Sequence, residues 1–293
     1  MNEQLQLFLN ETKYLVEEHL IESIKALQAP ASLKDAMIYS LKAGGKRIRP
    51  LLLLATLQGF NQPVEKGLDV ACSIEMIHTY SLIHDDLPAM DDDDLRRGKP
   101  TNHKVFGEAT AILAGDALLT HSFERMSMVD LPPAQVIRLI RELSIASGPI
   151  GMIGGQVLDM EGEDRALTLE ELSSIHEHKT GDLLSYSIVA GAIIAGAKEV
   201  DIFHLRHFAY DLGLLFQIKD DLLDIEGDEA LIGKPVGSDS ENNKSTYPHL
   251  LGVDGARTKL DEHYRFALSS LEKVKMDTEY LELLTTYIME RNH

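Results

Sequence analysis

The chain has 293 residues and carries 28 Lys and Arg against 47 Asp and Glu, so its formal net charge is −19. Binding of nucleic acid through bulk charge needs a basic surface, so the sequence argues against nucleic acid as a partner. Hydrophobic residues make up 44% of the chain, enough for a large core, and the single cysteine, Cys72, excludes an internal disulfide.

Apolar residues recur at helical spacing along the whole chain. Near the start, steps of three and four residues connect Leu5, Phe8, Leu9, Thr12, Leu15, Val16, His19 and Leu20. The same pattern predicts helices over 33–43, 51–59, 66–86, 109–128, 133–147, 169–179, 182–197, 199–224, 256–273 and 277–291, divided by Gly, Pro or Asp residues. No pair of β-rich runs flanks a two-residue turn, so we expect no sheet. The sequence predicts an all-α fold with a single domain over residues 1–293.

The most apolar stretch, residues 183–197, is interrupted by Ser, Tyr and Gly. A bilayer span needs about 20 apolar residues, so we interpret this stretch as a buried helix and expect no membrane anchor. The N-terminus lacks the basic and apolar regions of a signal peptide. A cytoplasmic location is therefore expected.

The second of two acidic clusters, QIKDDLLD at 217–224, ends an apolar segment. Asp220 and Asp224 are four residues apart and share a helix face, where two like charges repel each other. We therefore expect a cation beside them.

The first acidic cluster contains Asp85, Asp86 and Asp91, followed by three more Asp residues at 92–94. On an unbroken helix, Asp85 and Asp91 would be separated by about 240° around the axis. Pro88 cannot continue the helix and disfavours helical geometry in the residue before it. The sequence therefore predicts that the helix ends here and that a turn brings Asp91 back towards Asp85.

Each acidic pair follows an apolar segment, so the Asp85–Asp86 and Asp220–Asp221 pairs are predicted to border a cavity in the core. For residues 92–94 alone, a solvated loop is the more ordinary interpretation. Carboxylate oxygens with few other ligands suit Mg²⁺, which keeps waters and is usually completed by substrate phosphates. An EF-hand is excluded by the spacing. The sequence thus predicts metal ions that let an acidic protein bind an anionic substrate.

Basic residues occur beside glycine and proline in three places. GGKRIRP at 44–50 puts Lys46 and Arg49 at the start of a predicted helix, where free N–H groups favour anions. The other two places are RRGKPT at 96–101 and the pair formed by Lys234 and Lys244. We interpret these groups as diphosphate-binding, although surface ion pairing remains the alternative for any one of them.

Seven segments together resemble the ordered motif set of the trans-isoprenyl diphosphate synthases: GGKRIRP at 44–50, DDLPAMDDDDLRRGKPT at 85–101, GGQVLD at 154–159, KT at 179–180, FQIKDDLLD at 216–224, GK at 233–234 and NKSTYP at 243–248. The resemblance covers nearly the whole chain. The four residues between Asp86 and Asp91, and Tyr80 five positions before Asp85, are similar to the bacterial farnesyl diphosphate synthases of this family.

This resemblance implies an isoprenoid-synthase-type bundle of helices around a central cavity, with about three Mg²⁺ ions, replaceable by Mn²⁺, at the acidic clusters. The carboxylates implied to bind the metal ions, or to contact their ligands, are Asp85, Asp86, Asp91, Asp220, Asp221 and Asp224. The implied contacts to the allylic diphosphate are Arg96, Lys179, Thr180, Gln217, Lys234 and Lys244. The implied contacts to isopentenyl diphosphate are Gly45, Lys46, Arg49, His78 and Arg97. Tyr80, beside the small Ser81, would set the product length.

The implied reaction is a head-to-tail condensation in which dimethylallyl or geranyl diphosphate ionises first. Thr180, Gln217 and the Lys179 carbonyl would stabilise the allylic cation. Isopentenyl diphosphate would then attack, and the released diphosphate would take the proton, so no side-chain base is required. The resemblance also implies a homodimer. His293 is a departure, because relatives often end in a basic residue that helps to close the site.

Other classes of protein fit the sequence less well. A terpene cyclase would lack the second substrate site that GGKRIRP indicates, and an inactive regulatory subunit typically loses one Asp cluster, whereas both are intact here. A metal-free structural protein would have no reason to hold carboxylates against an apolar helix end. Within the family, a geranylgeranyl or longer-chain synthase remains open, because the distinction depends on the depth of the pocket.

Overall fold

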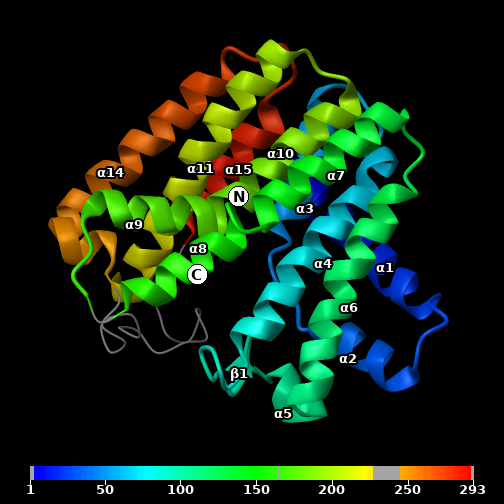
Figure 1. The fold of residues 1–293 in the computed structure, drawn as a ribbon. Helices are drawn as coiled ribbons and strands as arrows, with labels where there is room; N and C mark the ends of the chain where they lie inside the picture. The colour runs from blue at the N-terminus through cyan, green and yellow to red at the C-terminus, as the bar shows by residue number, and fades with distance from the viewer. Residues whose placement is uncertain (1–2, 164, 227–244, 292–293) are drawn as a thin grey trace.

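The computed structural model describes residues 3–163, 165–226 and 245–291, and it confirms the all-α prediction (Figure 1). The N-terminal half contains α1 Glu3–Lys25, α2 Ala31–Leu41, α3 Ile48–Gly59, the 3₁₀ turn η1 Val64–Gly67, α4 Leu68–Asp85, the short strands β1 Leu95–Arg96 and β2 Lys99–Pro100, α5 Asn102–Phe106 and α6 Glu108–Ser127. The rest contains α7 Pro133–Ser147, α8 Met152–Gly162, α9 Leu169–His176, the π-helical turn η2 Glu177–Gly181, α10 Asp182–Ala195, α11 Glu199–Glu226, α14 Tyr247–Leu271 and α15 Glu279–Glu290.

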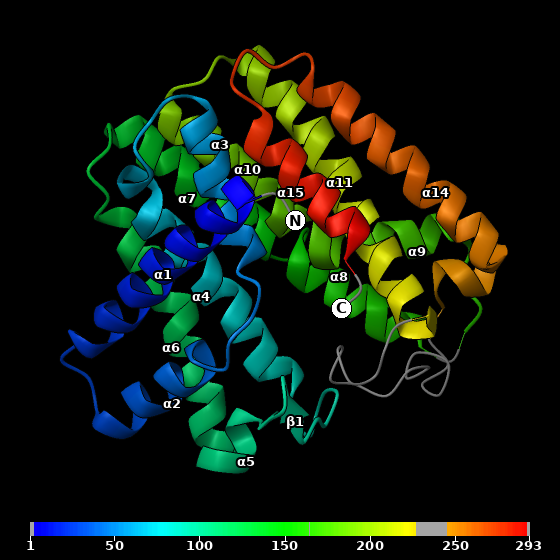
Figure 2. The same cartoon turned by 180° about the vertical axis from the view of Figure 1, so that it is seen from behind.

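Helix α10 lies at the centre of the bundle, with α3, α7 and α11 packed around it (Figures 1 and 2). Almost all of its residues are buried, as the sequence predicts for this apolar stretch. A Cβ atom added to Gly191 would lie 2.5 Å from the backbone oxygen of Leu53, so the missing side chain is what allows α3 to approach so closely. Within the described ranges, no helix combines the length and the apolar character needed to cross a bilayer.

The two helices that carry the acidic clusters pack against different helices. Helix α4 contacts α6 and α3, and α11 contacts α14 and α10. Both α4 and α11 end towards the same end of the molecule, where α4 meets the β1–β2 hairpin (Figures 1 and 2). The two clusters are therefore presented from the same end of the bundle.

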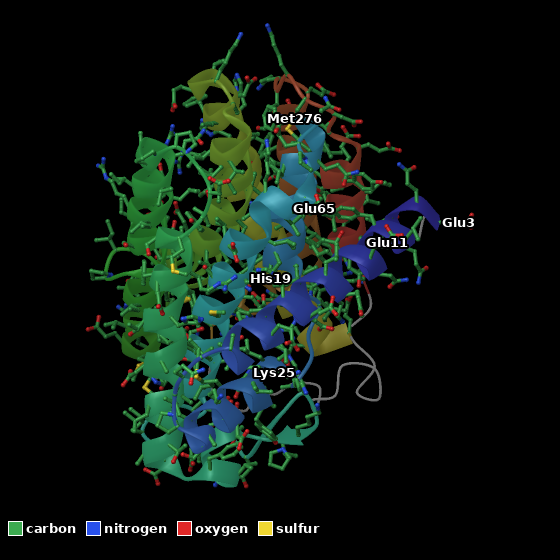
Figure 3. The ribbon with its side chains drawn as sticks, turned by 90° about the vertical axis from the view of Figure 1, so that its right-hand side faces the viewer. Glu3, Glu11, His19, Lys25, Glu65 and Met276 are labelled. Carbon is green, nitrogen blue, oxygen red and sulfur yellow. The ribbon has the colours of Figure 1, made fainter. Side chains whose placement is uncertain are left out.

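Helix α1 crosses the outside of α3 and α4, and its first turns lie against α15. The rings of Phe8 and Tyr280 stack with their centroids 4.3 Å apart. Figure 3 shows His19 where α1 passes over the neighbouring helices, and there its Nε2 lies 2.7 Å from Oδ1 of Asp69. Arg125 of α6 donates to the same carboxylate, so one acid ties three helices together.

The structure differs from the sequence prediction in five elements. The expectation of no sheet is wrong at one place, because β1 and β2 form a minimal antiparallel hairpin. Helices α5 and α8 were not predicted, and α14 begins at Tyr247 rather than at residue 256. Glycines disfavour helices, which hides α8 and the start of α14 from pattern analysis. Gly252, with φ of +71°, kinks α14 without ending it.

Candidate active site

The first acidic cluster folds as its proline predicts. Helix α4 ends at Asp85, and in the turn that follows, the backbone N–H of Asp91 donates to the carbonyl of Asp85 over 2.9 Å. The next residue, Asp92, has φ of +50°, a left-handed conformation that helps to reverse the chain. The turn therefore returns Asp91 to the end of α4.

Asp86 is buried and paired with the hairpin. The Nε atom of Arg96 donates to Oδ1 of Asp86 over 2.6 Å, and its Nη2 donates to Oδ2 of Asp93 over 3.3 Å. The hairpin turn is formed by Arg97 and Gly98, both with positive φ, as two-residue hairpins require. Because of this turn, Arg96 contacts Asp86 and Asp93, whereas Arg97 contacts Gly44.

Burial raises the pKa of Asp85 to about 6, with the charge of Lys179 lowering it and that of Asp91 raising it. Burial also raises the pKa of Asp86 to about 6, although the Arg96 ion pair lowers it. Because burial disfavours the ionised form of these two adjacent acids, a cation bound beside them would stabilise that form.

These carboxylates fit a hard divalent ion, since Asp85 and Asp91 offer only oxygen ligands. Among the residues that the structure places, no group of three or more His, Cys, Asp or Glu side chains lies close enough to hold a metal ion by itself. A site of this kind must be completed by water and by oxygens of a bound anion, which is the usual coordination of Mg²⁺ beside phosphates.

The two glycines of the GGKRIRP loop allow it to pack against the β1–β2 hairpin. Gly44 and Gly45 have φ of +96° and +128°. A Cβ atom on Gly45 would lie 2.5 Å from Nη1 of Arg97, and the same guanidinium donates to the backbone oxygen of Gly44. The loop and the hairpin turn are thus in direct contact.

Arg49 and His78 belong to a basic cluster with Arg97 of this contact. Burial lowers the pKa of Arg49 to about 10; Glu75 raises it and the charge of Arg97 lowers it further. Burial lowers the pKa of His78 well below its ordinary value, and Arg49 and Arg97 add to the effect. The buried Nε atom of Arg49 finds no hydrogen-bond partner within the described ranges. Cations packed this closely, with a donor unused, favour an anionic ligand.

Arg47, from the same motif, has a structural role that sequence analysis did not assign. Its Nη1 donates to Oε1 of Glu75 over 2.6 Å, and its Nε donates to Oε1 of Glu17 over 3.2 Å. Arg47 and Glu75 are almost fully buried, and Arg47 has φ of +52°. The ion pairs anchor the loop to α4 and α1 and so fix the position of the neighbouring residues Lys46 and Arg49.

The Lys179–Thr180 pair lies in the π-helical turn η2, a widened turn that is frequent at functional sites. The Nζ atom of Lys179 donates to Oδ2 of Asp159 over 2.5 Å. A Cβ atom on Gly155 would overlap the backbone nitrogen of Lys179, so the glycine lets α8 pack directly on η2. Asp159 was not among the predicted site residues, although the GGQVLD segment that contains it was noted.

In the second cluster, Asp220 is paired with the end of the chain. The Nη2 atom of Arg291 donates to Oδ1 of Asp220 over 2.6 Å and to the backbone oxygen of Phe216 over 3.0 Å. Burial lowers the pKa of Lys46, with Arg291 lowering it and Asp220 raising it. Lys46 therefore lies within electrostatic reach of Asp220, which brings the GGKRIRP motif close to the second cluster. Sequence analysis missed Arg291.

Asp221 and Gln217 contact residues of α14 and α9. Oδ2 of Asp221 accepts from the backbone N–H of Tyr247 over 2.9 Å, which fixes the start of α14. The side chain of Gln217 lies 3.3 Å from Nδ1 of His176. Asp224 follows on α11, one turn after Asp220. Asp221 is thus bound to the start of α14, whereas Asp220 is paired with Arg291.

Tyr80 lies on α4 with a side chain that is 5% exposed. Its ring meets the ring of His84 edge-on at 5.7 Å, and its hydroxyl is buried with no hydrogen-bond partner in the described ranges. Burial raises the pKa of Tyr80 to about 12, and the charge of Asp85 adds to the rise. Ser81 bonds to the backbone oxygen of His78 over 2.9 Å. Tyr80 is therefore a large buried ring near Asp85, in agreement with its predicted position.

Three residues named in the sequence analysis, Lys234, Lys244 and His293, lie outside the described residues. The other predicted site residues lie on a few elements. Gly45, Lys46 and Arg49 come from the GGKRIRP motif, His78, Tyr80 and Ser81 from α4, and Arg96 and Arg97 from the hairpin. Asp85, Asp86 and Asp91 lie at and after the end of α4, Lys179 and Thr180 lie in η2, and Gln217, Asp220, Asp221 and Asp224 lie along the end of α11.

An all-α bundle with buried carboxylates at the ends of two helices and a cluster of basic residues is typical of the helical enzymes that act on isoprenoid diphosphates. The chain belongs to the polyprenyl synthetase family, whose family model matches residues 30–281. The predicted family is therefore confirmed, and with it a prenyltransferase activity. Membership of this family implies the use of a divalent metal ion.

Relatives of known name match over nearly the full length. The chain is 57% identical to a farnesyl diphosphate synthase of Geobacillus stearothermophilus, covering 98% of this chain and 97% of the relative. It is 52% identical to a farnesyl diphosphate synthase of Bacillus subtilis, covering 100% of both. The crystal structure of an FPP/GFPP synthase from Zymomonas mobilis superposes with a TM-score of 0.88 at 37% identity, covering 99% of this chain and 100% of that one.

Proposed function

We propose that the chain is a farnesyl diphosphate synthase, which joins isopentenyl diphosphate head-to-tail to dimethylallyl or geranyl diphosphate and releases diphosphate. The observation that supports this proposal is that two groups of charged side chains differ in composition. One contains Arg49, His78 and Arg97, with Glu75 as a neighbouring acid. The other combines Lys179 with carboxylates such as Asp85, and so needs a metal ion to bind an anion. Two diphosphates with different metal requirements fit this pair of sites.

The reaction begins with the allylic diphosphate, held by Arg96 and Lys179. The bond between the allylic carbon and the diphosphate oxygen breaks, and both electrons leave with the diphosphate. Thr180, Gln217 and the Lys179 carbonyl stabilise the allylic cation. The double bond of isopentenyl diphosphate then supplies the electron pair for the new carbon–carbon bond, and the released diphosphate takes the proton that is lost. No side-chain base is required.

Bound Mg²⁺, about three ions that Mn²⁺ can replace, would neutralise charge on the leaving diphosphate. The residues that would hold these ions, directly or through water, are Asp85, Asp86, Asp91, Asp220, Asp221 and Asp224. The raised pKa of Asp85, caused first by burial, supports this assignment, because the ionised carboxylate needs a cation there. Lys234 and Lys244 complete the proposed contacts to the allylic diphosphate.

The proposed product is farnesyl diphosphate, with Tyr80 as the residue that stops chain growth and Ser81 beside it. The burial of the Tyr80 ring supports this assignment. A geranylgeranyl or longer-chain synthase is the alternative within the family, since relatives with that name match at up to 46% identity.

We further propose a cytoplasmic homodimer in which the whole chain forms one domain, with neither a nucleic-acid partner nor a membrane anchor. Large apolar side chains are exposed on α6 and α8, among them Leu113 at 59% and Val157 at 47%. Exposed apolar surface of this kind supports contact with a second copy of the chain.

The test is to incubate the purified protein with isopentenyl and dimethylallyl diphosphates and Mg²⁺, and to measure the mass of the lipid product after removal of the diphosphate. We expect farnesol, and no product when Mg²⁺ is removed by chelation. A product longer by one prenyl unit would replace the chain-length assignment, and the absence of any prenyl product would refute the proposed function.

A further inference from the structure

The two glycines of the GGKRIRP loop differ in their surroundings. Both have positive φ, +96° at Gly44 and +128° at Gly45, so a side chain would strain the backbone at either position. A Cβ atom added to Gly44 would have no atom of the described residues within 4 Å beyond its chain neighbours. A Cβ atom added to Gly45 would lie 2.5 Å from Nη1, 2.7 Å from Cζ and 2.8 Å from Nη2 of Arg97. The two positions are therefore alike in backbone strain but differ in contact.

The guanidinium group of Arg97 lies flat against this loop. The three distances are nearly equal, so the Cβ position of Gly45 lies over the face of the planar group and not at one edge. From there the group donates to the backbone oxygen of Gly44. Arg97 is an exposed residue, and a long exposed side chain would otherwise sample many rotamers. The loop therefore holds the guanidinium in one place, and it can do so because Gly45 has no side chain.

Other contacts fix the hairpin to α2. The hydroxyl of Tyr39 donates to the backbone oxygen of Pro100 over 2.7 Å. The Nζ atom of Lys99 donates over 3.0 Å to the backbone oxygen of Lys42, which caps α2 just before the two glycines. These contacts set the distance between the hairpin and the loop without involving Arg97. The guanidinium therefore occupies a space of fixed width, which a Cβ atom on the loop would fill.

Arg97 also belongs to the basic cluster. Burial lowers the pKa of Arg49 and that of His78, and the charge of Arg97 lowers both further, so Arg97 lies within electrostatic reach of each. A diphosphate in this cluster would be attracted by several basic groups at once. A guanidinium that is already in place binds it without the entropy cost of ordering a long side chain. The position of Arg97 therefore affects how tightly the cluster binds a diphosphate.

We propose that Gly45 is a positioning residue for Arg97: because it has no side chain, the guanidinium can lie against the loop, where it binds the diphosphate of isopentenyl diphosphate. This inference rests on the proposed function. A guanidinium binds phosphate oxygens through two parallel N–H groups, so its orientation matters as well as its charge. Binding of the allylic diphosphate should not depend on Gly45, because Arg96 is tied separately to Asp86 over 2.6 Å.

Alanine at each glycine in turn separates this role from backbone strain. Gly44→Ala and Gly45→Ala both place a side chain at positive φ, so both should lower the stability in urea by similar amounts. In Gly45→Ala the crowded atoms are the end of a flexible side chain, so the guanidinium should move and the loop should not. Calorimetry with isopentenyl diphosphate, without metal, should then show binding weakened about 10- to 100-fold, as for the loss of a hydrogen bond to a charged group. Gly44→Ala should weaken binding by a few-fold at most.

A double-mutant cycle tests whether Gly45 acts through Arg97. In an Arg97→Ala background there is no guanidinium to displace, so Gly45→Ala should add no more than the few-fold effect of Gly44→Ala. A full further loss would overturn the proposal, because the added methyl group would then block the ligand itself. Equal losses in Gly44→Ala and Gly45→Ala would also overturn it, since backbone strain would explain both. So would a KM for geranyl diphosphate that rises in Gly45→Ala as much as that for isopentenyl diphosphate.

A crystal structure of the wild-type protein with isopentenyl diphosphate, without metal, tests the inference with no variant. The Arg97 guanidinium should contact the diphosphate while it still lies over Gly45. A guanidinium that left Gly45 when the ligand bound would overturn the inference, even in an enzyme that made farnesyl diphosphate. If the wild type bound no isopentenyl diphosphate and made no prenyl product, the proposed function would fail, and the proposed role of Gly45 with it.

Discussion

Replacing Tyr80 by Ala is the change with the largest expected effect on the product. The ring is 5% exposed, so its removal leaves a cavity at a cost of about 3–5 kcal/mol, as for other large buried rings. The buried hydroxyl has no hydrogen-bond partner within the described ranges, so its removal should raise the free energy of unfolding by about 1 kcal/mol. The net loss of stability should therefore be about 2–4 kcal/mol.

The same cavity should let the product grow. Tyr80 is five residues before Asp85 on the continuous helix α4, about 7.5 Å further along its axis. A chain whose diphosphate is held at Asp85 would extend beside this part of the helix. The Tyr80→Ala variant should therefore condense both substrates but shift from C15 to C20 and longer products, measured by chromatography of the dephosphorylated lipids.

The matched control is Tyr80→Phe, which keeps the ring and removes only the hydroxyl. This variant should still stop at C15, with a stability in urea equal to that of the wild type or about 1 kcal/mol higher. If Tyr80→Ala were folded and still stopped cleanly at C15, another residue would limit the chain and the product assignment would lose its basis.

Three other predictions address the two acidic clusters, Arg49 and the buried Cys72. Asp85→Ala and Asp220→Ala should each reduce kcat by at least about 10²–10³, and full activity of either with Mg²⁺ in a diphosphate-release assay would contradict the metal assignment. Arg49→Ala should raise the KM for isopentenyl diphosphate far more than that for geranyl diphosphate, and Arg49→Lys should also raise it because the bidentate fork is lost; equal changes in both KM values would argue against separate sites. Burial raises the pKa of the Cys72 thiol, so a thiol reagent should label the native protein only as fast as it unfolds in urea.

The features that sequence predicts best are those set by neighbouring residues. Pro88 alone is enough to predict the end of α4 and the return of Asp91, because its effect on the backbone is local. The central position of residues 183–197 follows from composition in the same way. For the catalytic residues, single positions such as His78 carried little information, and the order of the motifs along the chain supplied their interpretation.

The missed features depend on distant partners. Arg291 reaches Asp220 across 71 positions of the chain, and Asp159 reaches Lys179 from another helix. The hairpin was missed because its strands have only two residues each, too few for an alternating pattern. Helix α8 was missed because Gly155 is needed for close packing on η2, and a glycine chosen for packing is indistinguishable in sequence from one that breaks a helix.

The π-helical turn has a consequence for chain length within the family. Residues 176 and 182, on either side of η2, both have helical backbone angles, so α9, η2 and α10 wind on without a loop. A π turn takes in one residue more than an α turn. Deleting one residue from 177–181 would restore a regular α turn, which covers nearly the same rotation with one residue fewer, so α10 would keep its face towards α3 but the widened turn that carries Lys179 and Thr180 would be lost. Active relatives should therefore vary in length elsewhere, and alignments should show no gaps at these five positions.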